Sequence, residues 1–389
     1  MEILVSVEKK NITSLLMNAF NRTWVMTVNL ALKVFTLLLF KKSVMERGRE
    51  FKNIVVYTAG VLGDNVVRLA AVANLKRRYP GATVTVMVST DADSKIPSQL
   101  FSSLPYVDDH AIANGQVLNR HTCDLFVNFS GSVSVGSIRL VLREMRYAYR
   151  MGAECAIGFY ISTYGLRKSL DPVQHHFLGN EPRRCYRVLR EIGLIPAENI
   201  SVFPENREAK DSVLSKLNAR GDEVFAVMSP GSGKQCKFWP PERFGQVAIL
   251  LQSHYNARVV LTGHADEREI AEKIHSSSKC GVTNLVGETS IQELVELLRM
   301  SRICITNDTG VLHVAAVLGI PTVAIFNMHL PPTWWFPDNE NIIQLFSVTE
   351  CSFCNKFICD SKKCLDNITV DHVFRAASEL ISQPESDGR

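Results

Sequence analysis

Residues 302–326 constrain the fold of this chain more than any other part of its sequence. They open with RICIT and close with TVAIF, two short β-branched runs typical of buried strands, and the apolar segment between them ends at a glycine and a proline. This pattern predicts a strand–helix–strand unit and therefore a parallel sheet covered by helices. The turn at residues 307–310 then lies where the helix begins, and the free backbone N–H groups there favour an anion.

A helix that is simply capped and buried explains the same turn without any ligand. His313 favours the binding site, because it lies one turn into an otherwise apolar helix, near the mouth of the turn. Gly310 has no side chain and lets a ligand approach the backbone closely. A diphosphate is therefore a suitable anion for this position.

Length and charge limit the class of protein. The chain has 389 residues, which suffices for a large core and two domains. Its formal net charge of +4 is too small to indicate bulk binding to nucleic acid, so we expect no nucleic-acid partner. The ten cysteines lack the density of a disulfide scaffold and indicate a reducing compartment.

Alternating strand and helix patterns occur in two sets along the chain. The first set has predicted strands at residues 53–58, 83–88, 125–129 and 156–159, and the second at 224–228, 258–262, 283–286 and in the unit described above. The pattern predicts an α/β fold of two doubly wound, Rossmann-like domains that face a cleft. We place the domain boundaries at 1–50 for an N-terminal helix region, 51–222 and 223–372 for the two domains, and 373–389 for a C-terminal helix and tail.

Residues 24–40 form an apolar stretch bounded by basic residues on both sides. The stretch is shorter than the roughly 20 apolar residues that a membrane-spanning helix needs. A helical projection gathers the polar side chains on one narrow face: Arg22, Asn29, Lys33 and Thr36. We expect an amphipathic helix in a membrane interface; a helix packed on the protein's own surface is the alternative. If the stretch does span, the richer positive charge after it keeps the body of the protein in the cytoplasm, and we expect a cytoplasmic body in either case.

Three loops follow predicted strands and should meet at the cleft. The first, GVLGD at residues 60–64, lacks the third glycine of a dinucleotide fingerprint. Asp64 in this loop either caps a helix or serves as a carboxylate that accepts a proton from a hydroxyl. The second loop, SPGSG at residues 229–233, leads to Lys237 but lacks two required positions of a phosphate-binding P-loop. Lys237 could reach a phosphate or could be solvated. The third loop is the turn at 307–310.

Four motifs follow one another along the chain: GD at residues 63–64, PGS with KFWPPERF between 230 and 244, LVGETSIQEL at 285–294, and NDTGVLHVAA at 307–316. Together they resemble glycosyltransferase family 9, the lipopolysaccharide heptosyltransferases. The resemblance runs from residue 53 to the C-terminal helix. It implies a GT-B fold with a C-terminal helix that crosses back to the first domain.

The resemblance also implies an inverting, metal-independent transfer of a sugar, with ADP-heptose as the expected donor and no further cofactor. The expected acceptor is an anionic glycolipid of the lipopolysaccharide-core type, at the cytoplasmic face of the inner membrane. Other readings are a GT-B glycosyltransferase with another nucleotide sugar and a non-catalytic nucleotide-sugar-binding protein. A sugar-nucleotide epimerase of the same fold is a third, but the order of the motifs fits it poorly.

Residue roles follow from the same resemblance. Asp64 corresponds to the general base, with Gly63 beside it on the acceptor side, and Lys237 corresponds to the group that neutralises the departing diphosphate. The donor-binding residues implied by the family are Ser232, Gly263, Asp308, Thr309, Gly310 and His313.

The first domain is rich in basic residues, which suits an anionic acceptor because arginine binds phosphate and carboxylate bidentately. Solvated helix faces are the alternative for many of them. We single out Arg143 and Arg146 as acceptor-side residues from the following set: Arg139, Arg143, Arg146, Arg150, Arg167, Lys168, Arg183, Arg184, Arg187 and Arg190.

The C-terminal part holds a compact cysteine segment, although we expect no required metal. Its four thiolates could surround a tetrahedral zinc ion or an iron–sulfur group, and they belong to Cys351, Cys354, Cys359 and Cys364. Against a metal, similar cysteine-containing tails accompany the family that the chain resembles. An Asp-x-Asp pattern at residues 91–93 fits a solvated loop better than a metal site in the cleft.

Overall fold

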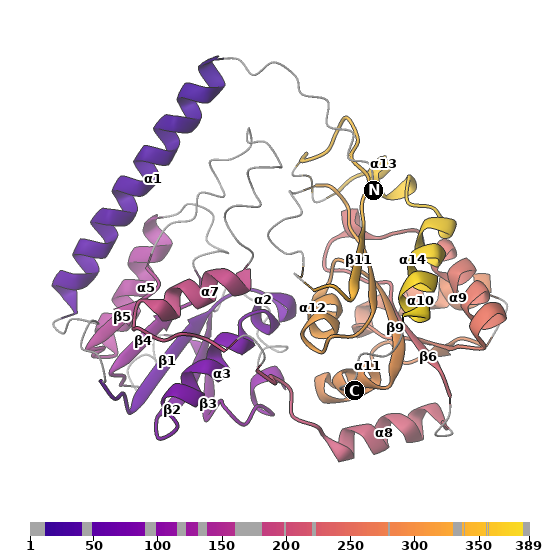
Figure 1. Ribbon diagram of the computed structural model, residues 1–389, viewed down its shortest axis with the longest axis horizontal. Helices are drawn as coiled ribbons and strands as arrows, with labels where there is room; N and C mark the ends of the chain where they lie inside the picture. Colours follow the sequence, from indigo (N-terminus) through magenta and orange to yellow (C-terminus); the bar gives the residue numbers. More distant parts are fainter. Residues whose placement is uncertain are drawn as a thin grey trace.

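The computed structural model describes residues 12–40, 49–89, 99–114, 122–130, 138–159, 181–197, 200–219, 223–278, 281–329, 337, 339–354, 356 and 358–383, with side chains from Met26 onward. The chain forms two parallel sheets, each with its own helices, that lie side by side (Figure 1). The Asp-x-Asp pattern, Arg167 and Lys168 lie outside the described residues.

The first sheet contains five strands in the order β3-β2-β1-β4-β5, all paired in parallel. Its central strand is buried along almost its whole length, as expected for a parallel strand covered on both faces. The predicted strands are confirmed, but β3 was missed because its sequence, DHAIA, has no β-branched run. The strands are β1 (Asn53–Thr58), β2 (Thr83–Ser89), β3 (Asp109–Ala113), β4 (Leu125–Asn128) and β5 (Cys155–Ile157).

The helices of the first half include a break that matters for the cleft. The sequence predicts one helix over residues 66–79, whereas the structure has α2 (Leu62–Val66) and α3 (Leu69–Arg78), with Arg68 as the N-cap of the second. Two further helices, α5 (Ile138–Arg150) and α7 (Glu181–Arg190), belong to this half.

The second sheet has six parallel strands in the order β11-β10-β9-β6-β7-β8. The strand–helix–strand unit predicted at 302–326 is confirmed as β9, α12 and β10. The strands are β6 (Phe225–Ser229), β7 (Arg258–Leu261), β8 (Thr283–Asn284), β9 (Ser301–Asn307), β10 (Thr322–Ile325) and β11 (Ile342–Leu345). The helices are α8 (Arg207–Leu217), α9 (Pro241–Tyr255), α10 (Arg268–Ser278), α11 (Ile291–Arg299), α12 (Gly310–Val317), α13 (Lys363–Asp366) and α14 (Val370–Ser382), with short 3-10 turns η5 (Gln235–Lys237) and η6 (Ala265–Glu267).

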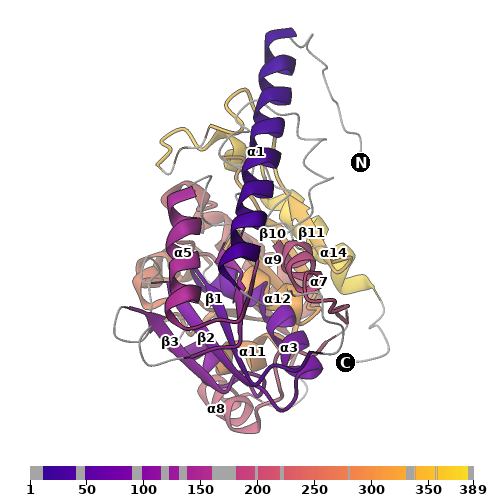
Figure 2. The ribbon, with the colours of Figure 1, turned by 90° about the vertical axis from the view of Figure 1, so that its left-hand side faces the viewer.

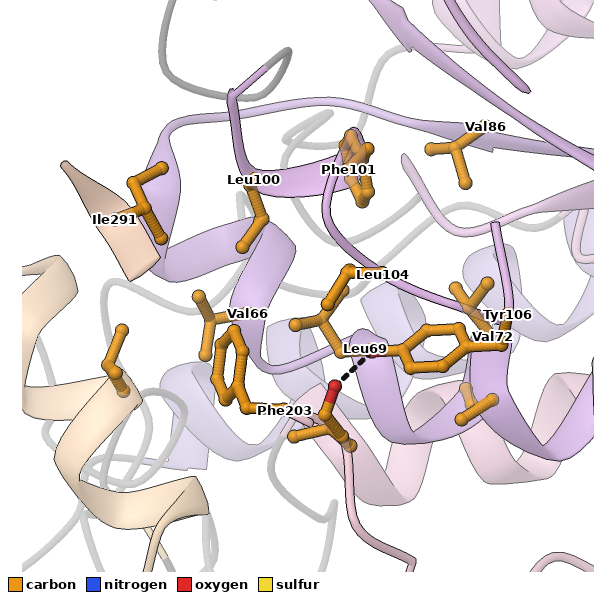
Figure 3. Close-up of a cluster of buried hydrophobic side chains, with 14 of the residues drawn as sticks. Val66, Leu69, Val72, Val86, Leu100, Phe101, Leu104, Tyr106, Phe203 and Ile291 are labelled. Carbon is orange, nitrogen blue, oxygen red and sulfur yellow. Dashed lines mark hydrogen bonds between the residues drawn. The ribbon is translucent and has the colours of Figure 1, made fainter. Parts of the chain in front are cut away.

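The two halves share one hydrophobic cluster. Figure 3 shows Ile291 of α11 beside Leu100, Val66 and Phe203, which come from the first half and its connection to the second. Helices α2 and α12 also pack against each other across this boundary. The carboxyl ends of β1 and β9, which precede these two helices, are therefore held close together.

The C-terminal helix does not cross back as the family resemblance implied. Helix α14 packs on α9 and on β9, β10 and β11 of the second half. The buried indole of Trp239 supports this arrangement, because its Nε1 donates to the carbonyl of Ile368 at 2.8 Å, just before α14. The expectation of a crossing helix was wrong because apolar residues of α14 complete the core of the second sheet.

Helix α1 (Ile12–Leu39) is longer than the predicted stretch, and much of it extends away from the body (Figures 1 and 2). Its C-terminal part packs on the first sheet through Leu32 and Phe40, and the Phe40 ring stacks on Phe159. Within the described residues, no helix combines the length and apolarity needed to cross a membrane.

The polar residues expected on one face of α1 are only partly covered by the protein, and the side chain of Arg22 lies outside the described residues. Thr36 is buried and its hydroxyl donates to the carbonyl of Leu32 at 2.7 Å, while Asn29 is half-buried. Lys33 remains exposed. The outward side is instead apolar, with exposed Met26, Leu30, Val34, Phe35, Leu37 and Leu38. A soluble surface helix normally shows the opposite arrangement.

Glu293 of α11 links this helix to α8 within the second half. Its Oε1 accepts hydrogen bonds from Lys216 at 2.5 Å and Ser212 at 2.6 Å, and its Oε2 accepts the Ser290 amide at 2.7 Å. Burial opposes ionisation, but these donors prevail and lower the pKa of Glu293 to about 2. The carboxylate therefore stabilises the fold only when ionised.

We predict that Glu293→Gln lowers the free energy of unfolding by about 1–2 kcal/mol at pH 7, because the ion pair and the charge-assisted hydrogen bonds of the carboxylate are lost. Because the folded-state pKa lies below the ordinary value, this contribution is complete above the unfolded pKa and disappears as the pH falls toward 2. Urea unfolding from pH 7 to pH 3 measures both quantities. An unchanged difference between the two proteins over that range would contradict the assignment.

Candidate active site

Asp64 is the third residue of α2, the helix that packs on α12 of the second half. Its Oδ2 accepts the backbone N–H of Val61 at 2.7 Å, so the residue closes the start of the helix without being its N-cap. No hydrogen bond of the described residues reaches the other oxygen, Oδ1. Gly60 has a φ of +100°, and a side chain there would collide with the carboxylate. The loop is thus shaped around an acid with one oxygen still able to accept a proton.

The surroundings of Asp64 make it a stronger base than an ordinary aspartate. Burial raises the pKa of Asp64, against the opposing effects of the Arg68 guanidinium, the Val61 amide and Lys237, and the charge of Glu181 adds to the rise. A raised pKa brings a carboxylate closer to the range in which general bases operate.

Lys237 lies in the second half, at the end of η5, and is ion-paired. Its Nζ is 2.5 Å from Oδ2 of Asp308, and both side chains are mostly buried. Burial alone would raise the pKa of Asp308, but the Lys237 ammonium holds it below the ordinary value. The Ser232 hydroxyl donates to the Asp308 carbonyl at 3.2 Å. Three predicted site residues are therefore brought together here.

His313 is buried beside this pair and is not a source of positive charge. Burial lowers the pKa of His313 to about 4, so the ring is neutral near pH 7. It faces the other half of the molecule: a Cβ at Gly63 would lie only 2.6 Å from its Cδ2 atom. His313 thus sits against the residue that precedes Asp64.

The amino end of α12 lies at the same boundary. Thr309 is the N-cap in extended conformation, but its side chain makes no capping hydrogen bond, contrary to one of the two readings of the sequence. A Cβ at Gly310 would lie 2.9 Å from Leu62 of α2. The approach of these two helices therefore requires glycine on both sides.

Gly263 lies two residues after the end of β7, beside Glu267, a residue that the sequence did not point to. A side chain at Gly231 or at Gly263 would strike the Glu267 carboxylate, which therefore stands between the two glycine turns. It accepts the His264 amide at 2.9 Å, and burial raises the pKa of Glu267. The only signal in the sequence is an acidic residue three positions after a loop histidine, which is typical of a helix start.

The structure does not bring the predicted acceptor-side arginines to Asp64. The Arg143 guanidinium lies over the Tyr147 ring, 6.0 Å from its centroid, and Arg146 is exposed on α5. The described contacts do not connect either residue with the cleft loops. Arg184 is not on a surface at all, because it is buried in an ion pair with Glu181. The role of Arg143 and Arg146 stays a prediction.

The cysteine segment lies next to η5, the turn that contains Cys236 and Lys237. Its four thiols are free and line one pocket with Cys236 and His329. Cys351 and Cys359 add to the burial that raises the pKa of Cys364. Within the part of the chain that the structure describes, no three histidine, cysteine or acidic side chains are gathered as a metal site. The thiols share a pocket without forming a ligand cage.

The architecture of two facing Rossmann-like halves is that of GT-B glycosyltransferases. The structure of Escherichia coli ADP-heptose lipopolysaccharide heptosyltransferase II superposes with a TM-score of 0.66 and 20% sequence identity, over 86% of this chain and all of that one. At this identity the similarity establishes the fold, and it confirms the α/β prediction.

The sequence identifies the family. Residues 113–365 match the model of glycosyltransferase family 9 (heptosyltransferase), so the chain belongs to that family. Lipopolysaccharide heptosyltransferase 3 of Escherichia coli K12 is 22% identical over 84% of this chain and 97% of its own length. Lipooligosaccharide heptosyltransferase 2 of Campylobacter jejuni is 26% identical over 41% of this chain, and the match spans only about half (52%) of that relative. Membership confirms the resemblance and the enzyme class, a glycosyltransferase.

We predict that Gly63→Ala destabilises the protein by about 1–3 kcal/mol, because the new methyl group forces α2 away from the buried His313 ring. Urea unfolding measures the change. The matched control is Gly233→Ala, since a Cβ at Gly233 meets no atom within 4 Å and should change stability by less than about 0.5 kcal/mol. Equal effects of the two substitutions would show that the halves do not touch at Gly63.

Proposed function

We propose that this chain is an inverting glycosyltransferase that moves a sugar, most simply heptose from ADP-heptose, onto a lipopolysaccharide-core-type glycolipid. The observation that carries the proposal is the pair of opposed groups at the cleft: Asp64 with a free carboxylate oxygen on one side, and Lys237 with the amino end of α12 on the other. A base and an anion site on opposite walls are what an in-line displacement requires.

In the proposed reaction, Oδ1 of Asp64 takes the proton of an acceptor hydroxyl. The hydroxyl oxygen forms a bond to the anomeric carbon while the bond from that carbon to the diphosphate oxygen breaks. The electron pair of the broken bond leaves with the nucleoside diphosphate. Attack from the face opposite the leaving group inverts the anomeric centre. A positioned base of this kind contributes roughly 10²–10⁴-fold to the rate.

In this proposal the negative charge of the departing diphosphate is stabilised without a metal. Lys237 supplies a point charge, and the amino end of α12 supplies backbone N–H groups and the positive end of the helix dipole. Thr309 and Gly310 lie at that end, and the neutral His313 can donate or accept a hydrogen bond beside it. No further cofactor is needed for this step.

Asp308 has a different role from direct phosphate binding. A carboxylate repels a phosphate, whereas the 2.5 Å ion pair fixes the ammonium of Lys237 in the cleft. We therefore assign Asp308 to orient the lysine, with Ser232 holding the Asp308 backbone.

The nucleoside is placed at the glycine turns that end β6 and β7. Gly231 and Gly263 make room for the Glu267 carboxylate, which lies between them and suits the hydroxyl groups of a ribose. The name of a relative in the family, ADP-heptose lipopolysaccharide heptosyltransferase II, supports adenosine diphosphate as the nucleotide.

The acceptor is placed on the first half, and the body in the cytoplasm at the inner-membrane surface. Helix α1 supports this location, because it exposes six large apolar side chains while Thr36 is buried and Asn29 is half-buried. Such a helix lies in a lipid interface at modest depth rather than spanning the bilayer. The enzyme would thereby bind its lipid-linked acceptor at the membrane surface on which it lies.

We predict that Asp64→Asn abolishes sugar transfer, by at least about 10²-fold, and leaves donor binding nearly unchanged. The amide keeps the size of the side chain but cannot take a proton. Transfer is measured with ADP-heptose and a lipid A–core acceptor, and binding by the rise in melting temperature with ADP-, UDP-, GDP- and CMP-sugars.

Two results would oppose the proposal in different ways. Full transfer by the Asp64→Asn enzyme would remove Asp64 from the chemistry. A larger thermal shift with a UDP- or GDP-sugar would replace the donor and leave the reaction class intact. Lys237→Met serves as the complementary variant, since it should weaken both donor binding and transfer.

We predict that a Leu30→Ser, Leu38→Ser double variant loses at least about tenfold in affinity for anionic phospholipid vesicles, because two exposed apolar anchors are removed. Vesicle flotation measures the bound fraction. The control carries Ile195→Ser and Val348→Ser, which remove two comparably exposed apolar side chains elsewhere. Similar binding by both variants would rule out α1 as the lipid contact.

A further inference from the structure

A buried ion triad lies directly behind the loop that carries Asp64. Arg68 is one turn beyond Asp64, and its Nε is 3.0 Å from Oε1 of Glu181 on α7. Arg184 pairs with the same carboxylate, with Nε 2.6 Å from Oε2 and NH2 2.5 Å from Oε1. All three side chains are less than a tenth exposed. Two arginines thus share one glutamate in the interior of the first half.

The triad holds the backbone at the ends of two strands. Arg68 donates to the Thr58 hydroxyl at 2.6 Å and to the carbonyl of Ala59, where β1 ends and the Asp64 loop begins. Arg184 donates to the carbonyl of Phe129, just after β4. Glu181 therefore ties two neighbouring strand ends together through its two arginines.

A second set of bonds completes the clamp on the loop. The Thr58 hydroxyl donates to Asn65 Oδ1 at 2.9 Å, and the Asn65 amide donates to the carbonyls of Gly60 and Val61. Arg68 is thus linked to the loop through Thr58 and Asn65 as well as directly. Movement of the guanidinium would move the backbone on either side of Asp64.

Stability is a weak reason for burying these three charges. Replacing a buried ion pair or triad with apolar residues of similar volume is often neutral or stabilising, because desolvation offsets the attraction. The triad also carries a net charge of one positive unit in a region of low polarity. Because the triad lies behind the loop that carries Asp64, its positive charge can favour the ionised form of the Asp64 carboxylate.

We propose that Arg68, Glu181 and Arg184 are positioning residues that set the basicity and the orientation of Asp64 from inside the first half. The proposal rests on the role of Asp64 as the base in the proposed function. Arg68 favours the ionised carboxylate, Glu181 opposes it, and Arg184 holds Glu181 in place.

Other charged groups also face Asp64 and limit what the triad controls. Lys237 and Lys234 approach from the second half, where both are electrostatically coupled to Asp64. His313 adjoins Gly63 but is neutral near pH 7, and the Val61 amide binds Oδ2 directly. These groups stay unchanged when the triad is altered, so they form a constant background in the test below.

The charges of Arg68 and Glu181 have opposite signs, so the proposal predicts opposite effects when each charge is removed. Arg68→Gln removes the positive charge nearest Asp64, so the acid limb of kcat/KM should move to higher pH. Glu181→Gln removes the negative charge, so the limb should move to lower pH. The double variant should return toward the wild-type profile. Between contacting charged residues, couplings of this kind change rates by about tenfold at a fixed pH on the limb.

Arg68→Lys separates charge from anchoring. Lysine keeps the positive charge but lacks the fork that reaches Thr58, Ala59 and Glu181 together. Its acid limb should stay close to that of the wild type while kcat falls. The control is Glu296→Gln, which changes another buried, ion-paired glutamate on α11 and should leave the acid limb in place. Melting temperatures confirm that each variant is folded.

A direct titration distinguishes failure of this inference from failure of the proposed function. The carbon-13 signal of the Asp64 carboxyl, assigned by its loss in Asp64→Asn, should titrate with the same opposite shifts even without an acceptor. Movement of both single variants in one direction, or no movement in folded proteins, would overturn the triad's role. Opposite shifts in a protein that transfers no sugar would retain the triad and reject the proposed reaction.

Discussion

The close approach of α2 and α12 is the constraint on which the rest of the site depends. Gly63 lies against the His313 ring and Gly310 against Leu62, so an added side chain at either glycine would collide with the other helix. Because α2 begins after β1 and α12 after β9, this contact sets the carboxyl edges of two separate sheets against each other. The same contact keeps Asp64 close enough to Lys237 for their charges to interact.

Much of the architecture could be read from the sequence because it depends on local patterns. The β-branched runs predicted the strands other than β3 and β11, including the unit from β9 to β10, and the ordered motifs predicted the family. Strands β3 and β11 were not predicted. The sequence of β3 has no β-branched run, and both strands are only partly buried. The break between α2 and α3 was missed for another reason. It depends on Arg68, whose partner Glu181 lies 113 residues further along the chain.

The candidate site was predictable in its residues and less so in their partners. The motifs located Asp64, Lys237 and Asp308, but only the structure shows that the last two form an ion pair. Glu267 was invisible because nothing local distinguishes it from an ordinary residue at a helix start. A helical projection of α1 likewise cannot say which face the protein covers, and only the structure shows that Leu32 and Phe40 pack on the first half. Tertiary contacts decide each of these cases.

Each sheet is built from one continuous stretch of chain, and α14 stays with the second sheet. This arrangement has a consequence for biosynthesis. Strands β1 to β5 can pair while the second half is still being made, since domains generally fold as units from the N-terminus during synthesis. The side of that early intermediate that later receives α11 and α12 would remain apolar and uncovered. The apolar side of α1 is exposed as well. The nascent first half would therefore expose two apolar surfaces at once, and we expect chaperones to bind the ribosome-bound chain.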